Sequence, residues 1–154
     1  MTTTTAPKLE VFSLKAPLLS EGNVHNLLGK TDALSLHIKV YARGGENRLH
    51  THLNEDHSFV VLDGQATFYD KDGNTLVVNK YQGALVSKGA FYRFHSSGEG
   101  CLVMLRVAAA KPDPESRGRI GVDGKPTHAN ENPSPSVRYS SPDCVTIPGK
   151  FFGA

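Results

Sequence analysis

The chain has 154 residues, with 38% hydrophobic and 21% charged side chains, a balance typical of one soluble globular domain. A formal net charge of +2, without a block of Lys and Arg, argues against a nucleic-acid-binding surface. Two cysteines, Cys101 and Cys144, do not make a disulfide scaffold, although a bridge between them stays open. Since no apolar run reaches membrane-spanning length and the N-terminus lacks a signal-peptide layout, we expect a cytoplasmic protein without membrane contact.

The first strong element is a strand over residues 33–42. Leu34, Leu36, Ile38 and Val40 alternate with polar positions, which is the period of a β-strand. We expect this aliphatic face to pack on the core and the opposite face, with His37, Lys39 and Tyr41, to lie at the surface. In the alternative interpretation the polar face points inward and binds an anionic substrate.

Short strands continue along the chain, separated by turn residues such as Asp72-Gly73. Strands at this spacing, without a strong helical pattern, predict an all-β antiparallel sandwich or barrel. The expected strands cover residues 57–63, 66–69, 75–80, 91–95 and 101–107.

The composition divides the chain into three parts. We predict an N-terminal strand or arm over residues 1–32 and a β-barrel core over residues 33–110. Residues 111–154 hold seven of the nine prolines, so they cannot continue the sheet core. Because this segment also contains apolar residues such as Phe151 and Phe152, we interpret it as an extended Pro/Gly-rich arm that packs on the barrel or on a partner subunit; a disordered tail is the alternative.

Three histidines, His50, His52 and His57, lie within eight residues. On a strand, His50 and His52 share one face about 7 Å apart along the backbone. His57 begins the next strand, so its imidazole can approach the same point. We therefore predict that these three side chains bind one metal ion and leave its other coordination positions open, as a catalytic metal requires.

The same stretch resembles the first sequence motif of the cupin family. In that motif a glycine is followed by five residues and His-x-His, then by a glutamate, and six residues later by a glycine. Here Gly44 precedes His50 and His52 at this spacing, His57 stands where the family has glutamate, and Gly64 closes the motif.

A weaker resemblance to the second cupin motif runs through QGALVSKGAFYRFHSS. Gly83 begins it and Gly89 matches, whereas Ser87 replaces the proline. Tyr92 stands where the family has its metal-binding histidine, and Ser96 where it has asparagine. The resemblance to the family covers about residues 33–107.

The resemblance implies a single jelly-roll barrel, often a homodimer, with a metal and a small-molecule pocket inside. Three neutral histidine ligands leave a divalent metal its full charge, which favours an anionic ligand such as a carboxylate or enolate. Iron(II) is favoured by the likeness to three-histidine cupin dioxygenases; zinc, nickel and manganese are the alternatives.

Three functions stay open. The first is a metal-dependent enzyme acting on a small anionic organic molecule, with a non-haem iron dioxygenase as its specific form. The second is a lyase or isomerase in which Tyr92 is the catalytic acid or base, with its pKa lowered by the metal. The third is a cupin that binds a small molecule without catalysis, with or without a metal. A metal-free barrel, in which the histidines are relics, is the remaining alternative.

Further residues near the motifs have weaker assignments. Arg48 could orient a substrate carboxylate, and Phe59 and Phe94 are expected to line the pocket. His95 is a reserve metal ligand if a β-bulge turns it inward. Glu55 and Asp56 could accept hydrogen bonds from the imidazoles, although we expect both to be solvent-exposed. His128 is expected in an exposed loop.

Overall fold

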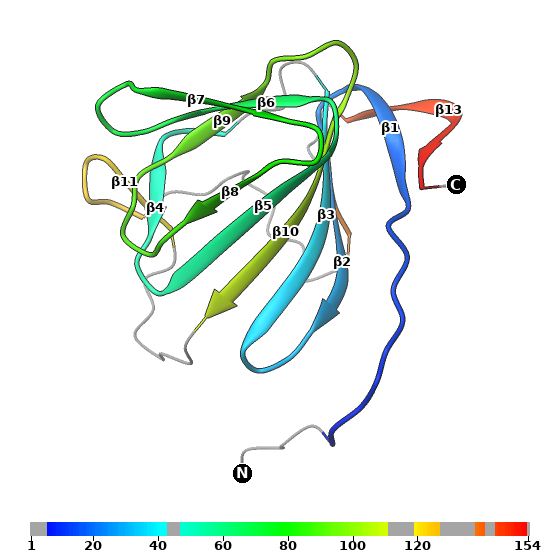
Figure 1. Cartoon of the computed structure of the whole chain (residues 1–154), viewed down its shortest axis with the longest axis horizontal. Coiled ribbons are helices and arrows are strands. Elements are labelled where there is room, and N and C mark those ends of the chain that lie inside the picture. The colour runs from blue at the N-terminus through cyan, green and yellow to red at the C-terminus, as the bar shows by residue number, and fades with distance from the viewer. Residues whose placement is uncertain (1–5, 43–46, 111–118, 127–137, 141–143, 154) are drawn as a thin grey trace.

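A computed structural model describes residues 6–42, 47–110, 119–126, 138–140 and 144–153 (Figure 1). No helix that could span a membrane is found in these ranges. The regular structure is entirely strand: β1 Ala16–Glu21, β2 Asn23–Lys30, β3 Leu34–Tyr41, β4 His50–His52, β5 Glu55–Asp63, β6 Gln65–Tyr69, β7 Thr75–Asn79, β8 Gly83–Val86, β9 Arg93–Ser96, β10 Leu102–Ala110, β11 Arg119–Gly121, β12 Arg138–Ser140 and β13 Val145–Phe152.

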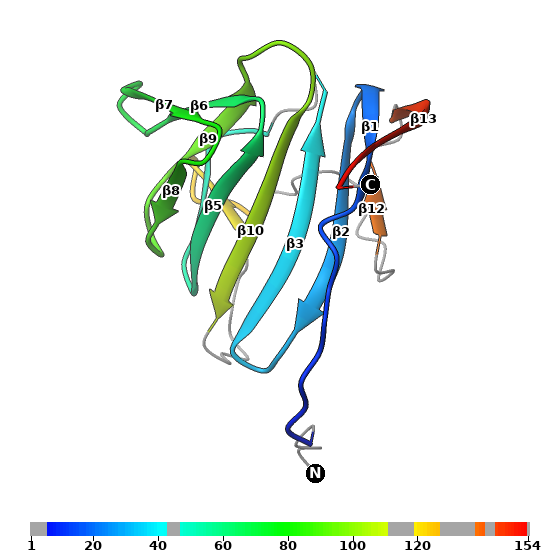
Figure 2. The ribbon, with the colours of Figure 1, turned by 45° about the vertical axis from the view of Figure 1, so that its right-hand side comes forward.

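Two antiparallel sheets face each other across the core. A six-stranded sheet has the order β12-β2-β3-β10-β5-β8, and a three-stranded sheet has the order β7-β6-β9. Figure 2 shows the strands from β8 to β2 side by side, with β6, β7 and β9 across from them. The predicted all-β jelly roll is confirmed, but the two sheets are hydrogen-bonded separately in the described residues and do not close into a continuous barrel.

Two smaller strand pairs complete the fold. β11 pairs with β4 at one end of the molecule, and β1 pairs with β13 along the outer face of the large sheet. Strands from residues 1–32, 33–110 and 111–154 all contribute to the six-stranded sheet. The predicted division into three segments therefore describes composition, and its use as a domain division stays a prediction.

Two apolar clusters lie on opposite faces of the six-stranded sheet. The inner cluster fills the space between the sheets and contains the aromatic residues Phe59, Phe68, Tyr92 and Phe94. The outer cluster lies beneath β1 and β13, where Ile38 and Val40 pack with their neighbours. The large sheet is therefore buried on both faces in this region.

The expected orientation of β3 is wrong. The aliphatic residues Ile38 and Val40 do pack in a core, but it is the outer one beneath β1. The alternate face, with His37, Lys39 and Tyr41, points between the two sheets, and Lys39 is only 8% exposed. The aliphatic pattern correctly predicted a buried face but could not show that β1 and β13 create a second core outside the sheet.

A tight connection at Gly64 joins β5 to β6 and explains the last glycine of the first motif. Gly64 has φ of +79°, a conformation that side chains with a Cβ rarely adopt. A Cβ at this position would lie 2.5 Å from the carbonyl oxygen of Cys101. The first glycine of the motif, Gly44, lies outside the described residues.

Candidate metal centre

Three structural segments bring the polar residues of the site together. β4 carries His50 and His52, and β5 carries Glu55 and His57. Residue Tyr92 forms a bridge with His50, with backbone hydrogen bonds of 3.1 and 2.9 Å in the two directions. The connection of only two residues between β4 and β5 therefore places both motif strands against one end of the inner core.

The tightest group of potential ligands comprises His52, Glu55 and His57. Their ligand atoms all lie within 4.8 Å of one another. Oε2 of Glu55 lies 2.8 Å from Nε2 of His57 and 3.5 Å from Nδ1 of His52. Two imidazoles and a carboxylate that converge in this way form the donor set used by non-haem iron(II) sites, so the residues present fit a divalent transition metal.

Both ring nitrogens of His57 have protein partners. The hydroxyl of Tyr92 lies 3.1 Å from Nδ1, while Glu55 approaches Nε2. We assign the tautomer in which Nε2–H donates to the carboxylate and Nδ1 accepts the hydrogen of the Tyr92 hydroxyl. Arg106 also lies 3.0 Å from Nε2, but in this tautomer its guanidinium donates instead to Glu55 at 3.4 Å.

His50 lies beside this group with its own orienting contact. Its Nδ1 is 2.6 Å from the backbone carbonyl oxygen of Arg48 and 2.9 Å from the guanidinium of Arg119. One nitrogen cannot donate to the first and accept from the second, and we assign donation to the carbonyl because that contact is shorter. Nε2 is then the nitrogen with a lone pair, which is the usual arrangement of a histidine metal ligand.

The three histidines are neutral near pH 7. Burial lowers the pKa of His50 to about 3 and that of His52 to about 2, and it also lowers the pKa of His57. The hydrogen bond from His57 lowers the pKa of Glu55, so this carboxyl is ionised. Neutral imidazoles and an ionised carboxylate are the protonation states that metal binding requires.

Cationic side chains surround the single carboxylate. Arg106 comes from β10 and Arg119 from β11, and both lower the pKa of His52 electrostatically. Lys39 from β3 would act in the same direction on His50 and His57 only in its protonated form. This part of the interior therefore has an excess of positive charge, which favours an anionic ligand.

Comparison with known proteins identifies the fold. No family model matches the sequence, and no curated protein matches it either. A conserved protein with a double-stranded β-helix domain from Klebsiella pneumoniae has a TM-score of 0.59 and 18% identity, covering 68% of this chain and 93% of that protein. The cupin domain of Schizosaccharomyces pombe Cnp3 has a TM-score of 0.54 and 17% identity, covering 58% and 61%.

A cupin superfamily protein from Desulfitobacterium hafniense has a TM-score of 0.52 and 17% identity, covering 59% of this chain and 81% of that protein. The chain has the cupin fold. At these identities the likeness concerns the backbone, and the family resemblance seen in the two sequence motifs agrees with it.

The cupin fold brings the predicted ligands together and adds one. His50, His52 and His57 form adjacent ring pairs, with centroids 5.0 Å apart between His50 and His52 and 4.3 Å apart between His52 and His57. Glu55 was expected to be solvent-exposed. Its side chain is instead about two-thirds buried, at 34% exposed, and it accepts a hydrogen bond from His57. Glu55 therefore places a carboxylate beside the histidines, two residues before the position at which the family motif has glutamate. The role of each residue as a ligand stays a prediction.

Tyr92 lies where the sequence predicted, between the histidines and the aromatic core. It is 6% exposed, and its ring is 4.5 Å from that of His50 and 5.7 Å from that of Phe59. Burial raises the pKa of the Tyr92 hydroxyl to about 12. The expected lowering of this pKa requires a bound metal cation, so it stays a prediction.

The remaining predicted site residues have different positions. Phe59 and Phe94 are fully buried in the inner cluster, where they support the site instead of lining an open pocket. Arg48 is exposed, and its backbone carbonyl, not its guanidinium, contacts the site. His95 points away and stacks on Tyr69, because β9 pairs with β6 without the bulge that a reserve ligand would need. His128 lies outside the described residues.

Sequence reasoning missed the interior cations. Arg106 stood in an apolar strand, and Arg119 stood in the proline-rich segment interpreted as an arm. A single arginine in an otherwise buried strand was an available signal, because a buried charge usually has a partner. No comparable signal marked Arg119, since its contact with His50 joins residues 69 positions apart.

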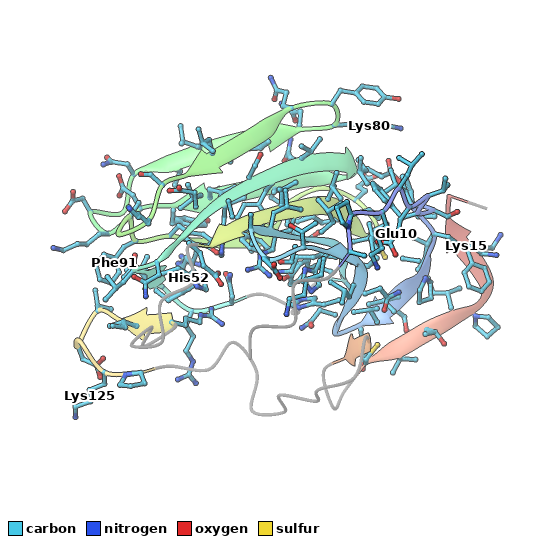
Figure 3. All side chains as sticks on the ribbon, turned by 90° about the horizontal axis from the view of Figure 1, so that it is seen from below. Glu10, Lys15, His52, Lys80, Phe91 and Lys125 are labelled. Atoms are coloured by element: carbon cyan, nitrogen blue, oxygen red, sulfur yellow. The ribbon has the colours of Figure 1, made fainter. Side chains whose placement is uncertain are left out.

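Two cavities lie next to the site. One of about 420 Å³ is bordered by the β2–β3 turn and reaches His37 and Glu55. The other, of about 310 Å³, is largely apolar and lies between β7 and β8, with Tyr92 and Phe91 among its lining residues. Figure 3 shows Phe91 beside His52 at the end of the molecule opposite Lys15.

Proposed function

We propose that this chain is a metal-dependent cupin enzyme that acts on a small anionic organic molecule. The observation that supports the proposal most strongly is the convergence of His52, Glu55 and His57, whose ligand atoms lie within 4.8 Å of one another. His50, with Nδ1 held by a backbone carbonyl, is the fourth proposed ligand. Iron(II) is the favoured metal because two imidazoles and a carboxylate suit it; zinc, nickel and manganese are alternatives.

The surroundings of the site support an anionic substrate. Arg106 contacts Glu55 at 3.4 Å, a long distance for an ion pair, so it keeps donor capacity for a second anion. Arg119 lies near His50 from the opposite strand pair. A bound metal would supply Lewis-acid chemistry or, in the case of iron(II), oxygen chemistry. The protein side chains bind and orient the substrate in this charged interior.

We propose a dioxygenase as the specific activity. In this reaction Arg106 holds the substrate anion, while Phe59 and Phe94 keep water from the inner end of the site. The test is oxygen uptake by iron-loaded, untagged protein with anionic enols, diketones, thiols and hydroxylated aromatics. Uptake with one class supports the proposal. No uptake by protein that retains iron contradicts it.

A lyase or isomerase reaction is the second candidate. The observation that favours it is the hydroxyl of Tyr92, which lies 3.1 Å from His57 and is protonated near pH 7. In this role Tyr92 donates a proton to the substrate, and His57 orients the hydroxyl. Turnover without oxygen that is lost in a Tyr92→Phe variant supports this activity. A cytoplasmic homodimer remains part of both proposals.

A further inference from the structure

Lys39 is a buried amine with an unusual environment. It lies on the inner face of β3 and is 8% exposed. Its Nζ lies 5.6, 5.7 and 5.8 Å from the ring centroids of Tyr41, Phe59 and Phe94. Among the described residues no carboxylate or hydrogen-bond acceptor contacts this nitrogen, and its neighbours are the three aromatic rings.

The charged neighbours of Lys39 oppose its protonation. Burial lowers its pKa well below the ordinary value, and the guanidiniums of Arg106 on β10 and Arg119 on β11 lower it further. His25 on β2 and His37 on β3 also face this region, and burial lowers the pKa of both imidazoles. Aromatic rings attract an ammonium by about 2 kcal/mol when desolvated, less than the cost of burying a charge without a counter-ion. Both effects favour the neutral amine over the ammonium, so Lys39 is neutral far more often than an exposed lysine.

A neutral lysine in an apolar pocket beside other cations is a nucleophile toward carbonyl carbon. We propose that Lys39 forms an imine with a small substrate that carries both a carbonyl group and a carboxylate, such as a 2-oxo acid. The proposal deepens the proposed function, because it rests on the anionic substrate inferred for the same interior. Arg106 lies close enough to influence Lys39 and binds the substrate carboxylate.

The reaction balances without a redox partner. The Nζ lone pair attacks the carbonyl carbon, and the carbonyl π electrons move to oxygen. One amine hydrogen moves to this oxygen and gives a carbinolamine. The carbinolamine then loses its hydroxyl and the remaining amine hydrogen as water, and a carbon–nitrogen double bond forms. The net change is one carbonyl compound and one amine converted to one imine and one water, so no oxidant or reductant is needed.

The cavity of about 420 Å³ ends at His37, short of Lys39, so the proposal requires the substrate to pass His37. His37 and Glu55 border this cavity, and His37 precedes Lys39 by two residues on the same strand. Both side chains therefore point to the same face, about 7 Å apart along the backbone. Arg106 pairs directly with His37 in the neighbouring strand. A carboxylate that enters past His37 thus meets Arg106 before its carbonyl reaches Lys39.

The test is reductive trapping on untagged, full-length protein. The protein is incubated with pyruvate or glyoxylate and sodium cyanoborohydride at pH 7, and modified lysines are mapped by peptide mass spectrometry. We expect Lys39 to be the main labelled lysine, with labelling about tenfold or more faster than at the exposed Lys80. Labelling spread over surface lysines with Lys39 unmodified would overturn the proposal.

Variants and metal removal make the result specific. Lys39→Met keeps a long unbranched side chain but removes the amine, so it should abolish the main adduct. The exposed control Lys80→Met should leave the adduct unchanged. The same labelling in Lys39→Met and wild type would overturn the proposal. Since mapping on the wild type needs no variant, a folding defect in Lys39→Met does not decide the outcome.

Trapping is repeated after dialysis against a chelator, with metal content measured separately. Labelling of Lys39 in protein that takes up no metal when metal is added back supports the imine and contradicts the metal-dependent function. Metal-loaded protein in which Lys39 remains unlabelled, before and after chelation, contradicts the imine alone.

Discussion

The hydroxyl of Tyr92 lies 3.1 Å from Nδ1 of His57, joining the two sequence motifs through one hydrogen bond. Nε2 of His57 continues the chain to Glu55 at 2.8 Å. Because both ring nitrogens are engaged, a metal bound by His57 must replace one of these partners. Metal binding by His57 would therefore change a hydrogen bond of Tyr92, the proposed acid, or of Glu55.

Replacing Tyr92 by phenylalanine should lower the free energy of unfolding by about 1–3 kcal/mol, because the variant leaves Nδ1 of His57 buried without a donor. Urea unfolding followed by circular dichroism measures this change. Tyr81→Phe is the control, since Tyr81 is 84% exposed and its variant should match the wild type. Equal stability of the Tyr92 variant and the wild type would disprove the hydrogen bond.

Replacing Glu55 by glutamine should lower metal affinity by at least roughly tenfold. The amide keeps the side-chain size and can still accept a hydrogen bond from His57, but it loses the negative charge at the site. Metal titration of protein stripped with a chelator measures the affinity. Asp56→Asn is the matched control, because its remaining oxygen can still accept from the backbone of Lys88. An unchanged affinity in the Glu55 variant would rule out Glu55 as a ligand.

Acid should destabilise the protein through its buried imidazoles. Burial lowers the pKa of His37 to about 4 and that of His25 well below its ordinary value. The unfolded chain therefore binds more protons than the folded one below about pH 6.5, and stability falls as the pH decreases from 6.5 toward 4. Each histidine contributes about 1.4 kcal/mol per pH unit within its window.

Unfolding in urea at a series of pH values gives this slope. His37→Gln should reduce it between pH 6.5 and 4 while keeping a polar side chain. Stability that does not change across that interval would show that these imidazoles titrate normally in the folded protein.

Substitution by alanine should lower the stability of the protein more at Gly64 than at Gly73. Both have positive φ, at +79° and +84°, so alanine costs about 1–2 kcal/mol at either site from the backbone alone. At Gly64 the new Cβ also meets the carbonyl oxygen of Cys101, whereas at Gly73 no atom lies within 4 Å. Thermal unfolding should show a clearly larger loss for Gly64→Ala, and equal losses would contradict the close approach.

The sequence predicted the strands and the histidine cluster because both are local patterns. Alternation over residues 33–42 predicted β3, and the spacing of His50, His52 and His57 predicted their convergence. The inward direction of Lys39 was missed, because it depends on β1 and β13 covering the opposite face. Glu55 was missed as a site residue because its contact with His57 depends on the path of the short β4–β5 connection.

The central claim is that His52, Glu55 and His57 hold a divalent metal. The most direct measurement is anomalous diffraction at the iron edge from crystals of untagged protein reconstituted with iron(II). The account predicts a single strong peak within bonding distance, about 2.0–2.2 Å, of all three side chains. A peak elsewhere, or no peak in protein whose three side chains are well ordered, would contradict it.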